Sequence, residues 1–79
     1  MKELLEIIAK RLVDNPDAVF VTEKQAQKGT VLELRVASDD MGKVIGKQGR
    51  IAKAIRVVMR AAAIHNNVYY TVDILPQEQ

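Results

Sequence analysis

The sequence predicts an α+β fold in which three helices cover one face of a three-stranded sheet, in the order helix, strand, strand, helix, helix, strand (α-β-β-α-α-β). Two patterns carry this prediction: apolar residues at helical spacing, and short stretches that alternate or are rich in β-branched residues. The 79 residues are 48% hydrophobic and 28% charged, which is typical of a globular protein with one small core. We therefore expect a single domain over residues 1–79, with an ordered core at about 2–75 and a short tail at 76–79.

The first helix is predicted over residues 4–13. Its apolar residues recur at intervals of three and four positions: Leu5, Ile8, Ala9 and Leu12. Charged residues occupy the other faces, so the helix is amphipathic. We expect it to end at Asn15 and Pro16, because proline disfavours helical geometry at the preceding residue and has no N–H to donate.

Three strands are expected. Residues 19–22 are rich in β-branched residues and predict a short first strand, followed by a polar turn region at 24–29. Residues 30–37 alternate, with every second residue apolar: Leu32, Leu34 and Val36. After a turn at Asn66 and Asn67, residues 68–75 predict the last strand, since they are rich in Val, Tyr, Thr and Ile.

Two helices are predicted between the second and third strands. Ser38 is a candidate N-cap for a short helix ending near Ile45, with Asp39 and Asp40 complementing the helix dipole. After a glycine-containing break, a longer helix is expected over residues 50–64. Its predicted buried stripe consists of Ile51, Ala54, Ile55, Val58 and Ala62, and its opposite basic side consists of Arg50, Lys53, Arg56 and Arg60.

Positive charge is concentrated in one part of the chain. Half of the 12 Lys and Arg residues lie between positions 43 and 60, namely Lys43, Lys47, Arg50, Lys53, Arg56 and Arg60. No Asp or Glu occurs between Asp40 and Asp73. A field of one sign attracts a polyanion or an acidic protein, and it does not distinguish between them.

The glycine loop (residues 46–49, sequence Gly-Lys-Gln-Gly) carries the strongest functional signal. Its two glycines allow a tight turn and a close approach of the backbone to a ligand. We expect the N–H groups near Gly49 and Arg50 to open the following helix and to point at an anion, with Lys47 adding a positive charge. The loop is not a nucleotide-hydrolase P-loop, because only three residues separate Gly42 from Gly46 and no Ser or Thr follows the lysine.

The residue inventory argues against an enzyme. Ser38 is the only serine, His65 is the only histidine and the chain has no cysteine, so no catalytic constellation is visible, and we expect no cofactor and no metal site. The frequent charges near the N-terminus exclude a signal peptide or a membrane span there, and we expect a cytoplasmic protein. The aromatic residues Phe20, Tyr69 and Tyr70 lie outside the basic tract, which makes an aromatic stacking platform a poor interpretation.

The run from Val44 to Ile51 (Val-Ile-Gly-Lys-Gln-Gly-Arg-Ile) resembles the signature of the KH domain, a single-stranded nucleic-acid-binding module built around a G-x-x-G loop. The predicted order of elements resembles the type II arrangement of bacterial KH domains, and the resemblance covers nearly the whole chain. It implies that the glycine loop grips the sugar-phosphate backbone of about four nucleotides while the bases lie in an adjacent groove.

Placed on this sequence, the resemblance gives three groups of candidate RNA-binding residues. The loop supplies Gly46, Lys47, Gln48 and Gly49; the apolar floor of the groove supplies Val44, Ile45 and Ile51; and an electrostatic track supplies Lys43, Arg50 and Lys53. Core packing is the expected main role of Ile45 and Ile51. The edge of the strand at residues 34–36 is expected to read the bases through its backbone groups.

We therefore expect a non-enzymatic protein that binds single-stranded RNA with little sequence specificity. One small module should bind weakly, which favours self-association or a second RNA-binding partner. The resemblance implies a homodimer, a complex with a larger KH-containing protein of the Jag (KhpB) type, and a role as a post-transcriptional regulator or RNA chaperone linked to cell elongation or division.

Two alternatives stay open. In the first, the chain is a protein-interaction adaptor whose basic helix binds an acidic protein, and exposed apolar residues away from the glycine loop would favour it. In the second, it is a ribosome-assembly factor that docks on structured RNA.

Overall fold

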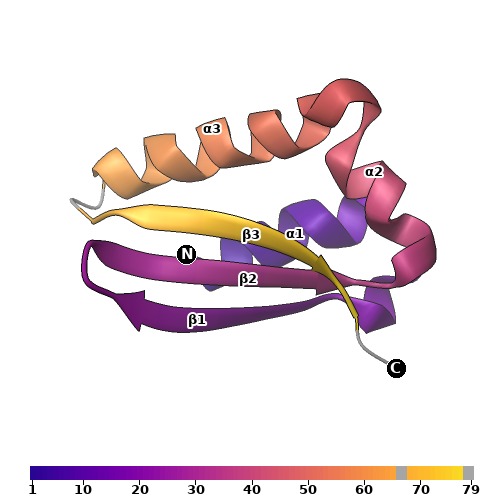
Figure 1. Cartoon of the computed structure of the whole chain (residues 1–79), viewed down its shortest axis with the longest axis horizontal. Coiled ribbons are helices and arrows are strands. Elements are labelled where there is room, and N and C mark those ends of the chain that lie inside the picture. The colour runs from indigo at the N-terminus through magenta and orange to yellow at the C-terminus, as the bar shows by residue number, and fades with distance from the viewer. Residues whose placement is uncertain (66–67, 78–79) are drawn as a thin grey trace.

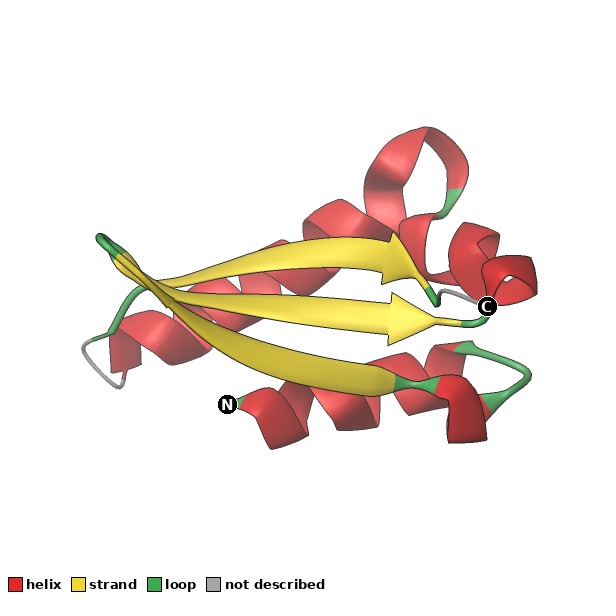
Figure 2. Cartoon of the chain, turned by 60° about the horizontal axis from the view of Figure 1, so that its bottom comes forward, coloured by secondary structure: helices red, strands yellow, loops and turns green. Residues whose placement is uncertain are grey.

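The computed structural model describes residues 1–65 and 68–77 and has three helices on one face of a three-stranded sheet (Figures 1 and 2). The main elements are α1 (Lys2–Leu12), β1 (Phe20–Ala26), β2 (Gly29–Val36), α2 (Met41–Ile45), α3 (Arg50–His65) and β3 (Tyr70–Pro76). Short 3₁₀ turns lie at Pro16–Ala18, Ser38–Asp40 and Lys47–Gly49. The predicted α+β class and the order α-β-β-α-α-β are confirmed.

The sheet is mixed, with the strands in the order β1-β2-β3. β1 and β2 form an antiparallel hairpin, whereas β2 and β3 run parallel. Parallel strands need a crossover connection, and α2 and α3 supply it by returning the chain across one face of the sheet (Figure 1). The central position of β2 leaves β1 and β3 as the edges.

The first hairpin is longer than the sequence pattern suggests. Residues 24–29 were expected to form a turn, but β1 continues to Ala26, which pairs with Gly29 across a two-residue turn. The prediction was wrong because Val21 is the only buried residue of β1. Pairing with β2 holds this edge strand in place, and its exposed polar side chains give no alternating pattern to detect.

The core lies between β2 and the helices. Its largest fully buried side chains are Leu5, Leu32, Leu34, Val36, Val44 and Met59. The predicted alternation in β2 is therefore confirmed, and α1 contributes Leu5 and Ala9 as expected. Each large apolar side chain buried in this way contributes roughly 1.5–3 kcal/mol to folding.

The buried stripe of α3 differs from the predicted one. The residues that α3 buries are Ala52, Ile55, Met59 and Ala63. Ala54 is exposed, and Val58 retains 46% of its accessible surface. Two apolar stripes overlap on this helix, and helical periodicity alone does not tell which of them faces the sheet.

The carboxylate of Asp40 joins α2 to the segment that follows α1. It accepts hydrogen bonds from the backbone N–H groups of Asp14 at 3.2 Å and Asn15 at 3.1 Å, and its residue is only 2% exposed. The predicted Ser38 N-cap is wrong, because Ser38 is the first residue of a 3₁₀ turn whose N-cap is Ala37, and the N-cap of α2 is Asp40. Asp39 and Asp40 lie in the first turn of this 3₁₀ segment, and the Asp40 carboxylate in addition makes contacts distant in sequence.

Lys43 completes this network. Its Nζ lies 2.7 Å from Asp14 Oδ2 and 3.5 Å from Asp40 Oδ1. Burial raises the pKa of the Asp40 carboxyl, but the two backbone N–H groups and the lysine outweigh burial and leave that pKa below its ordinary value. The hydrogen bond to Asp14 raises the pKa of Lys43.

The end of β3 is tied to the centre of the sheet by the Gln77 N–H, which donates to the Val36 carbonyl at 2.8 Å. The turn expected at residues 66–67 and the last part of the expected tail, residues 78–79, lie outside the described residues. Within the described ranges, no helix is long and apolar enough to cross a membrane.

Candidate nucleic-acid interface

The glycine loop joins α2 to α3 at one end of the molecule (Figure 1). Three of its four residues have positive φ angles: 75° at Gly46, 56° at Gln48 and 74° at Gly49. A Cβ built on Gly46 would lie 2.6 Å from Ile51 Cγ1, so only glycine fits there. The loop is therefore packed against the first turn of α3.

The N–H groups available to an anion are not those predicted. The Gly49 N–H donates to the Gly46 carbonyl at 3.2 Å, and the Arg50 N–H donates to the Lys47 carbonyl. Both predicted donors are therefore occupied. Among the described residues, the N–H groups of Lys47 and Gln48 have no hydrogen-bond partner. The free donors thus lie at the tip of the loop, two residues earlier than expected.

The loop side chains reinforce this cationic tip. Lys47, Gln48 and Arg50 are all exposed, and Arg50 Nη2 lies 3.5 Å from Gln48 Oε1. No carboxylate of the described part of the chain forms an ion pair with Lys47 or Arg50. Two exposed N–H donors beside two uncompensated cations suit a phosphate group.

The predicted apolar floor is only partly at the surface. Val44 is fully buried, so its side chain belongs to the core and cannot line a groove. Ile45 and Ile51 are half-buried and pack against the core, which agrees with the main role expected for them. In the predicted electrostatic track, Lys53 is exposed, whereas the charge of Lys43 is offset by the Asp14 and Asp40 carboxylates.

The strand edge expected to read bases is not available. Residues 34–36 belong to β2, whose two sides are paired with β1 and β3. The free edge beside α3 belongs to β3 instead. The Thr30 N–H donates to the Tyr69 carbonyl, so the backbone groups of Tyr69 point toward β2. Because successive residues of a parallel strand direct their N–H and C=O groups to opposite sides, those of Tyr70, Val72 and Ile74 point away from β2.

A second surface lies on the other side of α3. The α1–α3 groove, about 580 Å³ in volume, is lined by Leu4, Ile8, Leu12, Arg50, Ile51, Ala54, Ile55 and Val58. Except for Arg50, these side chains are apolar. The groove explains why the apolar stripe predicted for α3 contains Ala54 and Val58: that stripe faces α1 and solvent rather than the sheet.

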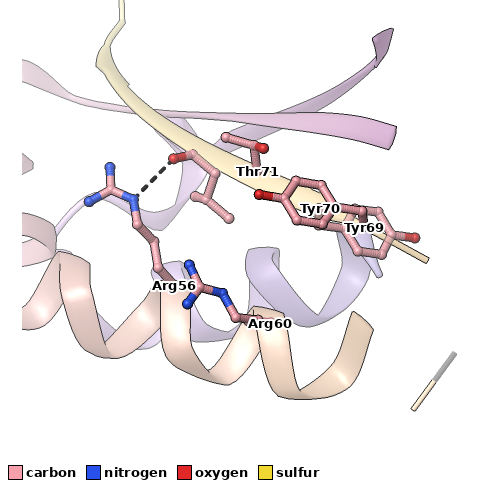
Figure 3. Close-up of a pocket in the computed structure, with 6 residues that line it drawn as sticks. Arg56, Arg60, Tyr69, Tyr70 and Thr71 are labelled. Carbon is pink, nitrogen blue, oxygen red and sulfur yellow. Dashed lines mark hydrogen bonds between the residues drawn. The ribbon is translucent and has the colours of Figure 1, made fainter. Parts of the chain in front are cut away.

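Two basic residues that the sequence analysis left out of the candidate site lie between α3 and β3. The α3–β3 notch, about 70 Å³ in volume, is lined by Arg56, Arg60, Tyr69, Tyr70, Thr71 and Val72 (Figure 3). Arg56 Nε donates to the Val72 carbonyl at 3.2 Å. Both arginines belong to the acid-free basic tract, and that tract was the available signal for including them.

The comparison with known protein families agrees with this architecture. Residues 2–74 match the family described as KhpA/KhpB, KH domain. The chain belongs to this family. The resemblance to a type II KH domain, found from the Val44 to Ile51 run and the order of elements, is thereby confirmed. The KhpA/KhpB KH family is non-enzymatic.

Three relatives named "RNA-binding protein KhpA" show how far the similarity extends. The Clostridium perfringens (strain 13 / Type A) relative is 60% identical over 95% of this chain and 100% of its own length. The Aquifex aeolicus (strain VF5) relative is 54% identical over 77% of each chain. The Treponema pallidum (strain Nichols) relative is 46% identical over 94% of this chain and 92% of its own length.

Within the described residues, no group of three or more His, Cys, Asp and Glu side chains is placed to hold a metal ion. Asp40, the one buried carboxylate among them, already accepts two backbone N–H groups. The candidate site consists of the glycine loop, α3 and the free edge of β3.

Proposed function

We propose that this KH domain binds single-stranded RNA and that its glycine loop grips the sugar-phosphate backbone. The observation that carries the proposal is the pair of unpartnered N–H groups at Lys47 and Gln48, presented beside an exposed lysine. Membership of the KhpA/KhpB KH family, and relatives that are named RNA-binding protein KhpA, support RNA as the polyanion.

The positions of these groups assign the phosphates and the bases of the RNA to different parts of the site. Phosphates contact Lys47, Gln48 and the neighbouring Arg50 and Lys53, whereas the bases lie between α3 and the free edge of β3. The outward backbone groups of Tyr70 and Ile74 on that edge can form hydrogen bonds with base edges, whereas the Val72 carbonyl already accepts from Arg56 Nε. Most of the affinity is electrostatic, because a single module contacts few bases, so sequence specificity is low.

The experiment is fluorescence anisotropy with short single-stranded RNAs over a series of salt concentrations. It compares the native chain with the double variant Lys47→Asp/Gln48→Asp, and circular dichroism verifies that both are folded. The native chain should show a slope of about −0.7 in log K against log [salt] for each phosphate contacted. The variant should lose binding. If the folded variant binds as tightly as the native chain, the proposed role of the loop is wrong.

We further propose that the α1–α3 groove receives a second copy of the chain, giving a homodimer. Val58 at 46% exposure and Ile7 at 57% exposure leave apolar surface uncovered on these two helices. Such a surface on a small protein usually marks an interaction site, and two linked RNA sites bind more tightly than one. A homodimer would have a molar mass in solution of twice 8.8 kDa.

The same groove favours the adaptor alternative, because it places apolar surface away from the glycine loop. In our proposal the adaptor function accompanies RNA binding, and a larger KH-containing protein of the Jag (KhpB) type is the heterologous partner. Post-transcriptional regulation or RNA chaperoning linked to cell elongation or division completes the proposal and rests on family membership alone. Co-purification of RNA and of that partner with the tagged chain tests it, and recovery of neither would contradict it.

A further inference from the structure

A buried carboxylate lies at the start of the helix that carries the glycine loop, and the proposed function does not use it. Asp40 is the N-cap residue of α2, yet its side chain makes no capping hydrogen bond to that helix. Its two oxygens bind the chain that follows α1 instead: Oδ1 accepts from the Asp14 N–H and Oδ2 from the Asn15 N–H. Asp40 therefore ties α2 to a segment 25 and 26 residues earlier in the chain.

Lys43 strengthens this connection from within α2. Its Nζ lies 2.7 Å from Asp14 Oδ2 and 3.5 Å from Asp40 Oδ1, so it joins the same two segments. We call Asp14, Asp40 and Lys43 the α2 latch. A buried carboxylate is unfavourable unless it is hydrogen-bonded and paired, and the latch meets both conditions for Asp40, which is 2% exposed.

α2 depends on the latch because the helix is short. It has five residues, and Val44 is its only buried side chain. A helix of this length is not stable by itself, since few backbone hydrogen bonds offset the entropy lost in forming its first turn. Contacts with the rest of the fold must hold it in place. Val44 attaches its middle to the core, and the latch attaches its first turn to the chain that follows α1.

The orientation of α2 sets the position of the glycine loop. The Gly46 N–H donates to the Gly42 carbonyl at 2.8 Å, so the loop begins on the last turn of α2 (Figure 1). Five helical residues at about 1.5 Å each place the start of the loop roughly 7.5 Å beyond Asp40. A tilt of α2 would therefore displace the free N–H groups at the tip of the loop.

We infer that Asp40 is a positioning residue for RNA binding, which holds the glycine loop, through the α2 latch, in the orientation that meets phosphate. The inference rests on the proposed function, because it assigns a further determinant of the same RNA site. A loop that is correctly oriented for only a fraction of the time has its affinity reduced by that fraction. Lys43 then acts within the latch and not as a phosphate contact.

The sign of the effect separates positioning from electrostatic attraction. Asp40→Asn removes a negative charge and releases Lys43 from one of its two carboxylates, so attraction alone predicts tighter binding of RNA. Positioning predicts weaker binding. The neutral amide is a weaker acceptor, and it offers one oxygen where the carboxylate offers two to the backbone N–H groups.

The test measures the affinity for a four-nucleotide single-stranded RNA at neutral pH by fluorescence anisotropy. Asp40→Asn is compared with the native chain and with Asp39→Asn, which removes the same charge from the exposed neighbouring residue. Val21→Ala controls for a general loss of stability, because Val21 is buried in β1 and lies outside the latch and the loop. The loop variant Lys47→Asp/Gln48→Asp is measured in parallel, and circular dichroism establishes that each variant is folded.

Asp40→Asn should bind this RNA about three- to tenfold more weakly, which corresponds to a loop oriented correctly for roughly a third to a tenth of the time. Asp39→Asn should bind with native or slightly higher affinity, and Val21→Ala with native affinity. Hydrogen exchange gives an independent readout. Protection of the Gly46 N–H, which reports the last turn of α2, should fall in Asp40→Asn and stay native in Asp39→Asn.

Lys43→Gln determines the role of the lysine and tests the latch even if Asp40→Asn does not fold. As part of the latch, Lys43→Gln should weaken binding without changing the salt slope. Loss of a phosphate contact would instead make the slope shallower by about 0.7, and that result would contradict the assignment. In the double variant Asp40→Asn/Lys43→Gln the two losses should be less than additive, because both residues act through one connection.

Failure of this inference is distinguishable from failure of the proposed function. If folded Asp40→Asn binds RNA at least as tightly as the native chain while the loop variant loses binding, the inference is wrong and the proposed function stands. If the loop variant keeps native affinity, the proposed function is wrong and the positioning role with it. If Asp40→Asn and Val21→Ala weaken binding equally, Asp40 acts only through overall stability, and the positioning role is disproved.

Discussion

Ile51 occupies the space that any side chain on Gly46 would need. A Cβ at Gly46 would lie 2.6 Å from Ile51 Cγ1 and 2.9 Å from its Cδ1, and the φ angle of 75° at Gly46 disfavours other residues as well. Ile51 in turn packs against the core. The position of the glycine loop is therefore set by the same contacts that stabilise the fold.

The two loop glycines should consequently differ in their tolerance of alanine. Gly46→Ala meets both the left-handed backbone and the Ile51 side chain, so we expect a loss of about 2–5 kcal/mol in the free energy of unfolding. Gly49→Ala has the backbone cost alone, since nothing lies within 4 Å of its Cβ, and should lose about 1–2 kcal/mol. Urea denaturation of both variants measures the difference, and equal losses would refute this explanation of Gly46.

Gly42 should respond in the opposite direction. It lies inside α2, is exposed, and has nothing within 4 Å of the point where a Cβ would lie. Gly42→Ala should therefore raise the free energy of unfolding by about 0.5–1 kcal/mol, because alanine loses less backbone entropy on folding. The same urea titration measures it. A destabilised Gly42→Ala variant would show that the helix does not accept a side chain there.

Acid should destabilise the protein partly through Asp40. Because the folded-state pKa of this carboxyl is lowered, its contribution to stability is complete above the unfolded value of about 3.9 and is lost as the pH falls through the folded value. The Tm of the native chain should therefore fall more steeply as the pH drops below about 4, where the unfolded-state carboxyl begins to bind a proton, than the Tm of Asp40→Asn. At pH 7 the variant should be the less stable protein, since a neutral amide binds the Asp14 and Asn15 N–H groups more weakly.

Parallel Tm curves for the two proteins over that acidic range would contradict this role of Asp40. The other carboxylates titrate in both proteins, so their effect cancels in the comparison. Salt provides a second control. Added salt should weaken the exposed Lys43–Asp14 pair more than the buried hydrogen bonds that Asp40 accepts from the backbone, because buried groups are screened less.

The proposed dimer predicts that charge in the α1–α3 groove separates the copies. Val58→Glu places a carboxylate among apolar side chains, so light scattering should give the molar mass of one chain instead of two. Ile64→Glu is the matched control: Ile64 is 73% exposed on the same helix but does not line the groove, and its variant should remain dimeric. A native chain that is monomeric at high concentration would overturn the proposal.

Much of the fold could be predicted because periodicity reports burial directly. The alternation of Leu32, Leu34 and Val36 identified β2, and the helical spacing of Leu5 and Ala9 identified α1. β1 was truncated in the prediction because an exposed edge strand carries little of that signal. The stripe of α3 was misplaced because its apolar residues serve both the sheet and the α1–α3 groove.

The sequence predicts the kind of site and the position of its glycine loop, but not which backbone groups are free to bind a ligand. The spacing of Gly46 and Gly49 located the loop, but which N–H groups remain free depends on the 3₁₀ turn at Lys47–Gly49, and sequence pattern does not show it. The role of β3 as the free edge depends on strand order. Lys43 looked like part of the basic track because its partners Asp14 and Asp40 meet it only in the folded chain.

The central claim is that the backbone N–H groups at the tip of the glycine loop hold RNA phosphate. The most direct measurement is a ¹H–¹⁵N NMR titration of the native chain with a four-nucleotide single-stranded RNA. The account predicts that the amide resonances of Lys47 and Gln48 shift most, while those of Leu4 and Ile8 in the α1–α3 groove stay in place. Loop amides that do not move while RNA binds elsewhere would contradict it.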